Sequence, residues 1–100
     1  MLPGRAVVDS EGNEIGRISD VISHPATLQP EWFVVRTGRI GGEHLVPVEA
    51  VVSTEEGQVV APFGRDWIKH APRAKDHASP TRPERDALYE YYGLAVPPGR

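Results

Sequence analysis

The fold is decided by a stretch that begins with Leu45-Val46-Pro47-Val48, resumes after a turn as Val60-Ala61-Pro62-Phe63 and closes with Leu88-Tyr89-Glu90-Tyr91-Tyr92-Gly93. In the first two segments a proline follows a short apolar run, and because proline has no N–H to donate, it marks the end or the edge of a β-strand. The third segment has apolar residues at helical spacing and ends at a glycine. This order predicts short β-strands followed by one amphipathic helix.

Trp32–Thr37 is the clearest strand upstream of that stretch. Aromatic and β-branched residues favour a pleated, half-buried surface, and here they succeed one another along the run. Because side chains alternate between the faces of a sheet, we expect Phe33 and Val35 on one face and Trp32 on the other.

A second apolar run, Ile15–Ile22, departs from strict alternation because Ile15 and Ile18 are three residues apart. Two interpretations remain open. A β-bulge near Gly16 would restore the register and bend the strand, whereas a short helix would accommodate the same spacing. The shorter run Ala6–Val8 precedes it and is separated from it by turn-forming residues.

A hairpin follows the strand that we expect at His44–Val48. Val51–Thr54 and Gln58–Ala61 flank Glu55-Glu56-Gly57, which places glycine where the turn needs a positive φ. Six short strands separated by glycine turns indicate a small six-stranded β-barrel, so the expected fold class is mainly β with a C-terminal α-helix. Closure into a barrel would leave no exposed strand edge.

The C-terminal helix has sequence signals at both ends. Thr81 and Glu84 have the spacing of a capping box, in which each side chain accepts a hydrogen bond from the other residue's backbone N–H. Gly93 stands where a helix commonly ends, and Leu94 can make the accompanying apolar contact. An isolated helix of about 11 residues is only marginally stable in water. This helix must therefore dock on its own barrel, on a second copy or on another protein.

One face of that helix is expected to carry Leu88, Tyr91 and Tyr92, which are separated by three and four residues and should point inward. Tyr89 is expected to lie off this face. Tyrosine and tryptophan bury a large area and keep a polar tip, so they are favoured at protein interfaces.

Gly64–His70 is expected to form a single helical turn that lays Trp67 and Ile68 on the barrel. Trp67 has two interpretations there, a plug for the end of the barrel or an anchor for a partner. The candidate interaction surface therefore comprises Trp67, Ile68, Leu88, Tyr89, Tyr91 and Tyr92.

The chain is expected to divide into a barrel at residues 1–70, an extended connector at 71–80, the amphipathic helix at 81–94 and a flexible tail at 95–100. Its 100 residues correspond to one domain. No cysteine is present, so stability must come from packing and not from disulfides. The N-terminus lacks the apolar run of a signal peptide, and no window approaches the roughly 20 apolar residues of a membrane span. We therefore expect a cytoplasmic protein.

Charge is distributed unevenly along the chain, whose net charge is −3. Residues 1–63 hold nine acidic and four basic residues, whereas residues 64–100 hold five acidic and seven basic ones. The two regions could be ordinary solvated surface, or the basic region could pack on the acidic one within a chain or between two copies. A nucleic-acid-binding domain usually presents a dominant basic stripe, and none is present, so nucleic acid is not the expected partner.

Recognisable catalytic and metal-binding motifs are absent from the sequence. Histidines occur at four positions, His24, His44, His70 and His77. They lack the close spacing that zinc ligands usually have. No Gly-x-Ser-x-Gly elbow and no phosphate-binding loop occurs. We expect no metal, no cofactor, no small-molecule substrate and no enzymatic activity.

An ordered set of motifs spans nearly the whole expected barrel. They are Val7-Val8-Asp9, Gly12, Ile15–Val21, Glu31–Val35, Val46-Pro47-Val48, the hairpin leading into Pro62-Phe63, and Ala71-Pro72. Together they resemble the PRC-barrel family, and Leu88–Gly93 is similar to the tail of its stand-alone bacterial members. The resemblance implies a six-stranded β-barrel with a role in protein–protein contact or assembly, without catalysis.

Two functions of different class remain open. The first is a small assembly module, a homodimer that also binds an unidentified protein through barrel edges and the tail. The second is a ribosome- or RNA-associated factor, because the resembled family includes the C-terminal domain of the small-ribosomal-subunit maturation factor. The family also includes the cytoplasmic domain of the photosynthetic reaction-centre H subunit, which implies association with a photosynthetic complex as a further alternative. The acidic net charge favours the assembly module.

Overall fold

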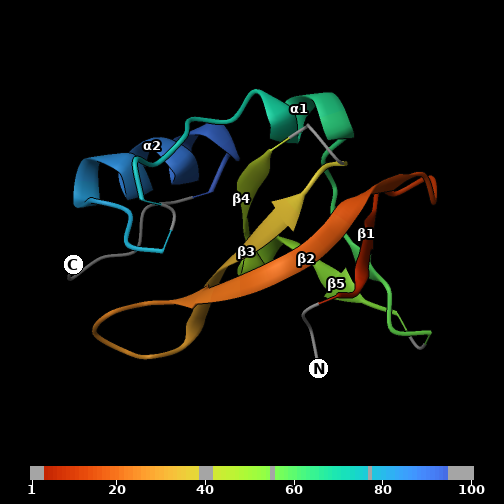
Figure 1. The fold of residues 1–100 in the computed structure, drawn as a ribbon, viewed down its shortest axis with the longest axis horizontal. Coiled ribbons are helices and arrows are strands. Elements are labelled where there is room, and N and C mark those ends of the chain that lie inside the picture. Colours follow the sequence, from red (N-terminus) through yellow and green to blue (C-terminus); the bar gives the residue numbers. More distant parts are fainter. Residues whose placement is uncertain (1–3, 39–41, 55, 77, 95–100) are drawn as a thin grey trace.

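The computed structural model describes residues 4–38, 42–54, 56–76 and 78–94. Its strands form one six-stranded sheet, and both α-helices follow the last strand (Figure 1). The elements in chain order are β1 (Ala6–Val8), β2 (Glu14–Ser23), β3 (Pro30–Arg36), β4 (Glu43–Pro47), the 3₁₀ turn η1 (Val48–Ala50), β5 (Val52–Ser53), β6 (Val59–Val60), α1 (Arg65–Lys69) and α2 (Arg82–Tyr91).

The sheet has the strand order β4-β3-β2-β1-β6-β5. Neighbouring strands are antiparallel except β1 and β6, which run parallel. The expected mainly β class, the six strands and the C-terminal helix are therefore confirmed. The expected closure into a barrel is wrong, because β4 and β5 form the two ends of the sheet and do not pair with each other in the described part of the chain.

The short strands at one end explain why the sheet stays open. β5 and β6 are two residues long each, and Val52 of β5 is 64% exposed. Strands this short form too few hydrogen bonds to extend the sheet until β5 could pair with β4 at the opposite edge. β4 ends at Pro47, as its proline predicts, and the chain then enters η1. The expected hairpin is confirmed, with Gly57 at a φ of +88°.

β2 is a strand of ten residues, so the interpretation of this region as a short helix is wrong. In its pairing with β1, Ile15 is an extra residue beside Gly16. The expected bulge near Gly16 is therefore confirmed. Because the bulge resets the alternation, both Ile15 and Ile18 reach the core, with 1% exposure each.

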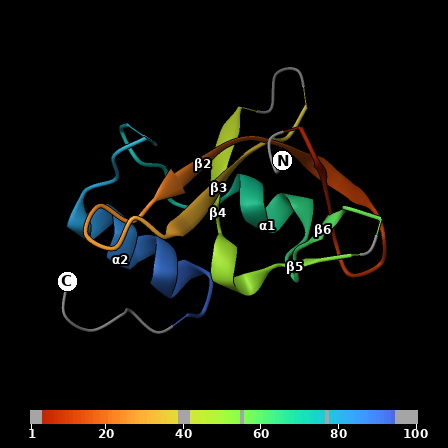
Figure 2. The ribbon, with the colours of Figure 1, turned by 90° about the horizontal axis from the view of Figure 1, so that it is seen from below.

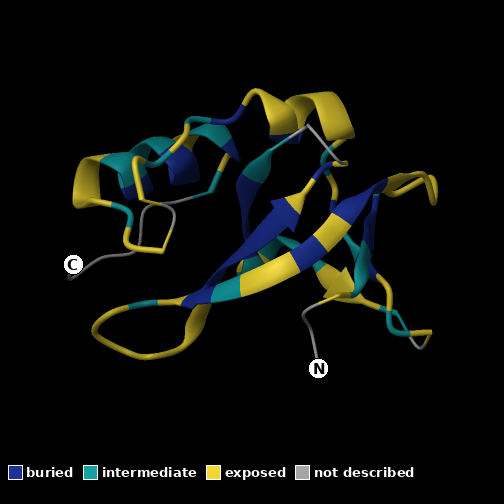
Figure 3. Ribbon diagram, viewed as in Figure 1, coloured by how far each residue is buried: buried dark blue, intermediate teal, exposed yellow. Residues whose placement is uncertain are grey.

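β3 lies between β2 and β4 and is covered on both faces. Residues 31–35 are all buried (Figure 3). On one side α2 lies against Trp32, whose ring centroid is 5.1 Å from that of Tyr89. The burial of both faces explains why this strand reads as a nearly continuous apolar run.

α2 begins and ends as the sequence predicts. The Thr81 hydroxyl accepts a hydrogen bond from the Glu84 N–H over 3.3 Å, and the Glu84 carboxylate accepts one from the Thr81 N–H over 2.8 Å. At the other end Gly93 has a φ of +75°, and its N–H donates to the Glu90 carbonyl. The Leu94 N–H reaches back to the carbonyl of residue 89, which completes a Schellman motif.

α2 packs on the sheet of its own chain and supplies part of the core. Figure 2 shows α2 at one end of the molecule and the β5–β6 hairpin at the other, with α1 between them. Residues 71–80, the expected connector, contain no helix or strand among those described, and the expected tail at 95–100 lies outside the described residues. In the described ranges neither helix has the length and apolar character needed to cross a membrane.

Candidate functional site

Trp67 and Tyr91 stack on each other where α1 meets α2. Their ring centroids are 4.4 Å apart, and their planes are inclined by 20°. The Tyr91 hydroxyl donates a hydrogen bond to the Trp67 carbonyl oxygen over 2.6 Å, which couples the two helices. Trp67 is nevertheless 49% exposed. A large aromatic ring that is held in place and yet accessible is well suited to contact a partner.

A hollow of about 400 Å³ lies beside this stacked pair. Its lining residues are Pro62, Phe63, Gly64, Trp67, Tyr91, Tyr92 and Gly93. We call this surface the aromatic patch. None of its residues carries a charged side chain, so the desolvation cost of covering it is low.

Tyr92 links the aromatic patch to β4 of the sheet. Its hydroxyl donates a hydrogen bond to the Leu45 carbonyl over 2.7 Å, and its ring centroid is 4.7 Å from that of Phe63. Burial, and secondarily the neighbouring Tyr91, raises the pKa of Tyr92 above its ordinary value. Like any tyrosine hydroxyl, this one is protonated and can donate at neutral pH, so the aromatic patch lies on residues that are packed and hydrogen-bonded.

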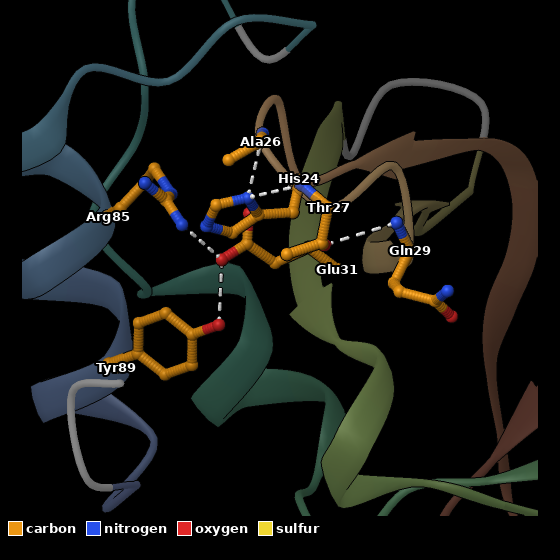
Figure 4. Close-up of polar contacts among 7 residues, drawn as sticks. All are labelled: His24, Ala26, Thr27, Gln29, Glu31, Arg85 and Tyr89. Atoms are coloured by element: carbon orange, nitrogen blue, oxygen red, sulfur yellow. Dashed lines mark hydrogen bonds and ion pairs between the residues drawn. The ribbon is translucent and has the colours of Figure 1, made fainter. Parts of the chain in front are cut away.

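A buried charged cluster joins α2 to β3 (Figure 4). One carboxylate oxygen of Glu31 accepts hydrogen bonds from the Arg85 guanidinium over 2.6 Å and from the Tyr89 hydroxyl over 2.7 Å. The Arg85 and Glu31 side chains are 8% and 6% exposed. Burial, followed by the hydrogen bond to the Glu31 carboxylate, raises the pKa of Tyr89, so its hydroxyl keeps its proton. Paired charges of this kind position the helix on the sheet.

The loop between β2 and β3 lies over this cluster, as Figure 4 shows. His24 Nδ1 accepts backbone hydrogen bonds from Ala26 and Thr27, over 3.0 and 3.4 Å. His24 also lines a hollow of about 150 Å³ with Glu31 and Tyr89. Because the Glu31 oxygen is already engaged by two donors from α2, the cluster acts as a structural lock between helix and sheet.

The structure separates the six residues of the candidate interaction surface into two groups. Four lie in the chain's own core at no more than 5% exposure: Ile68, Leu88, Tyr89 and Tyr92. The other two, Trp67 and Tyr91, stack at the surface. The expected helical turn is present as α1, but it lays only Ile68 on the core and leaves Trp67 against α2.

The prediction that Tyr89 lies off the inward face of the helix is wrong. The buried positions of α2 and its C-cap follow an i, i+3, i+4, i+7 pattern: Arg85, Leu88, Tyr89 and Tyr92. Because the first of these positions is an arginine, the sequence does not show an apolar face here. The signal that could have revealed it is Glu31, the one acidic residue of the apolar strand β3, because a buried carboxylate needs a charged partner.

The histidines are dispersed over the fold. His44 is buried on β4, and the His70 Nδ1 lies 2.7 Å from the Asp66 carbonyl oxygen. His77 lies outside the described residues. Within the ranges that the structure describes, no three potential metal ligands come together.

A family model described as the PRC-barrel domain matches residues 2–68 of the chain. The match covers every strand of the sheet and ends within α1, so α2 and Tyr91 lie beyond it. No curated protein matches the chain significantly.

Proposed function

Because the chain belongs to the PRC-barrel domain family, we propose that it is a non-catalytic protein–protein interaction module that forms a homodimer through the aromatic patch. The observation that supports this function best is Trp67, a ring that is 49% exposed although it is held by Tyr91. Rigid aromatic anchors of this kind supply much of the binding energy at protein interfaces.

Self-association suits the aromatic patch because it carries a projecting ring and a hollow side by side. In a two-fold dimer the same surface is used by both copies, so each Trp67 can enter the hollow beside the Trp67 of the other copy. A stable interface buries about 800 Å² on each partner. The surfaces of α1 and α2 around the patch must therefore join the contact.

A different protein can be engaged at the open edge of the sheet. β5 is an end strand whose neighbour on one side is β6, and its Val52 is 64% exposed. Because β5 is only two residues long, its exposed apolar side chain, and not the addition of a strand, would provide this contact. This second contact would leave the aromatic patch free for the dimer.

Sedimentation velocity tests the homodimer. The full chain should sediment as a dimer, and Trp67→Ala should shift it to a monomer without loss of folding, because the ring is half exposed. Leu28→Ala is the matched control, since it shortens an apolar side chain that is 75% exposed in the β2–β3 loop and should leave the dimer intact. A full chain that remains monomeric at high concentration would contradict the homodimer.

A further inference from the structure

Among the described residues, three arginines line a second hollow, and no lining residue given for it belongs to the aromatic patch. Arg17 of β2, Arg36 of β3 and Arg65 of α1 line it, and its volume is about 340 Å³. Its other lining residues are Glu14, Gly16 and Gly38. The two glycines carry no side chain, so the arginine side chains dominate the chemistry of this arginine hollow.

Arg17 and Arg36 face each other across neighbouring strands. They are register partners in the antiparallel pairing of β2 with β3, and their side chains are 63% and 62% exposed. Like charges directly opposite each other destabilise a sheet. A local arrangement that works against stability, placed at a concave surface, is typical of a functional site.

The acidic neighbours offset only part of this charge. The Arg17 Nε lies 3.9 Å from the Glu14 carboxylate, beyond hydrogen-bond distance, whereas Arg36 Nη2 donates to Glu43 over 3.1 Å. Arg65 donates to the backbone carbonyls of residues 14 and 15, which hold it over β2 without neutralising it. Since a guanidinium has five N–H donors, the three side chains retain donors for an added acceptor.

The arginines of the hollow stand out because the surrounding region of the chain is acidic. Residues 1–63 hold nine acidic and only four basic residues, and two of those four are Arg17 and Arg36. A nucleic acid would bring many phosphates against the acidic remainder of this region. One or two carboxylates can instead enter the hollow and accept paired hydrogen bonds from a guanidinium, whose planar fork matches a carboxylate.

We propose that the arginine hollow binds the carboxylate side chains of an acidic peptide segment in a partner protein. This site goes beyond the homodimer proposed above, because neither Trp67 nor Tyr91 lines it. Arg65 of the hollow and Trp67 of the aromatic patch both belong to α1, but their side chains point to different elements. Arg65 contacts β2, whereas Trp67 stacks on α2.

Fluorescence anisotropy with a labelled oligoglutamate peptide tests the proposal on the full chain. The peptide should bind at low ionic strength, and an oligoglutamine peptide of equal length should not. Arg17→Gln and Arg36→Gln should each raise the Kd for oligoglutamate about fivefold, because each removes one exposed charge-assisted contact. Arg82→Gln removes an exposed arginine at the start of α2 and should leave the Kd within about twofold.

Three results would overturn the proposal. One is no binding of oligoglutamate at low salt. Another is an equal loss of affinity in Arg82→Gln, which would indicate nonspecific attraction. The third is tighter binding of a labelled single-stranded oligonucleotide that depends on the same arginines, which would assign the hollow to nucleic acid. Thermal melting establishes that each variant is folded, and because Arg17 and Arg36 are tested separately, unfolding of one variant leaves the other decisive.

Discussion

Arg85 on α2 donates a hydrogen bond to Glu31 on β3 over 2.6 Å, although the two residues are 54 positions apart and both are buried. Removing two charges from water costs free energy, and the cost is recovered only when they pair closely. The Tyr89 hydroxyl, 2.7 Å from the same carboxylate oxygen, adds a further donor. The contact therefore joins α2 directly to β3.

Replacement of Arg85 by alanine should lower the free energy of unfolding by about 3 kcal/mol, because it leaves the Glu31 carboxylate buried without its cation. Urea denaturation followed by circular dichroism measures the loss. The triple substitution Glu31→Leu, Arg85→Met and Tyr89→Phe should recover much of it, since it removes both charges and also the hydroxyl that donates to Glu31. Equal destabilisation in the single and triple variants would show that packing, and not the ion pair, holds the helix.

Gly16 lies so close to β3 that it tolerates no side chain. A Cβ atom at this position would overlap the carbonyl group of Arg36. Gly16→Ala should therefore push β2 and β3 apart and lower the free energy of unfolding by about 3 kcal/mol. Gly64→Ala is the matched control, because a Cβ there meets nothing within 4 Å and should cost about 1 kcal/mol at most. Similar midpoints for the two variants in urea would contradict this reading of the close approach.

Stability should fall at alkaline pH because of the buried tyrosines. Burial raises the pKa of Tyr92 above its ordinary value of 10.0, and burial together with Glu31 raises that of Tyr89. Above about pH 10 the unfolded chain loses these protons while the folded chain keeps them, so the free energy of unfolding decreases as the pH rises. Below pH 10 these tyrosines should contribute no slope.

Tyr92→Phe separates ionisation from hydrogen bonding. It should lower the free energy of unfolding by about 1 kcal/mol at neutral pH, because the Leu45 carbonyl loses its donor. It should also flatten the alkaline slope, which Tyr92 can contribute at no more than about 1.4 kcal/mol per pH unit. Urea titrations at several pH values on both sides of 10 give the slope, and an unchanged slope in the variant would refute the role assigned to Tyr92.

Local features of this fold could be predicted because neighbouring residues determine them. The capping box of Thr81 and Glu84 and the glycine stop at Gly93 depend on backbone groups within a few positions. The bulge beside Gly16 could also be predicted, since Ile15 and Ile18 cannot both be buried in a regular strand. The role of Trp67 at an interface stays a prediction, which rests on the preference for large aromatic residues at interfaces.

Features that depend on distant contacts could not be predicted. Closure of the sheet depends on whether β5 reaches β4, and the two-residue length of β5 reflects packing that no local pattern encodes. The Glu31–Arg85 pair joins residues on different elements, and the inward orientation of Tyr89 follows from it. The arginine hollow likewise arises from strand register, which places Arg17 opposite Arg36.

The capping box at the start of α2 should contribute measurably to stability, because the helix has only ten residues and depends on its ends. Thr81→Ala removes the acceptor for the Glu84 N–H, which lies 3.3 Å from the hydroxyl oxygen, and should lower the free energy of unfolding by about 1 kcal/mol. Thr81→Ser keeps a hydroxyl in the same place and should retain most of that free energy. If serine and alanine destabilise the protein equally in urea, the methyl group of Thr81 and not its hydroxyl is responsible, and the cap contributes nothing.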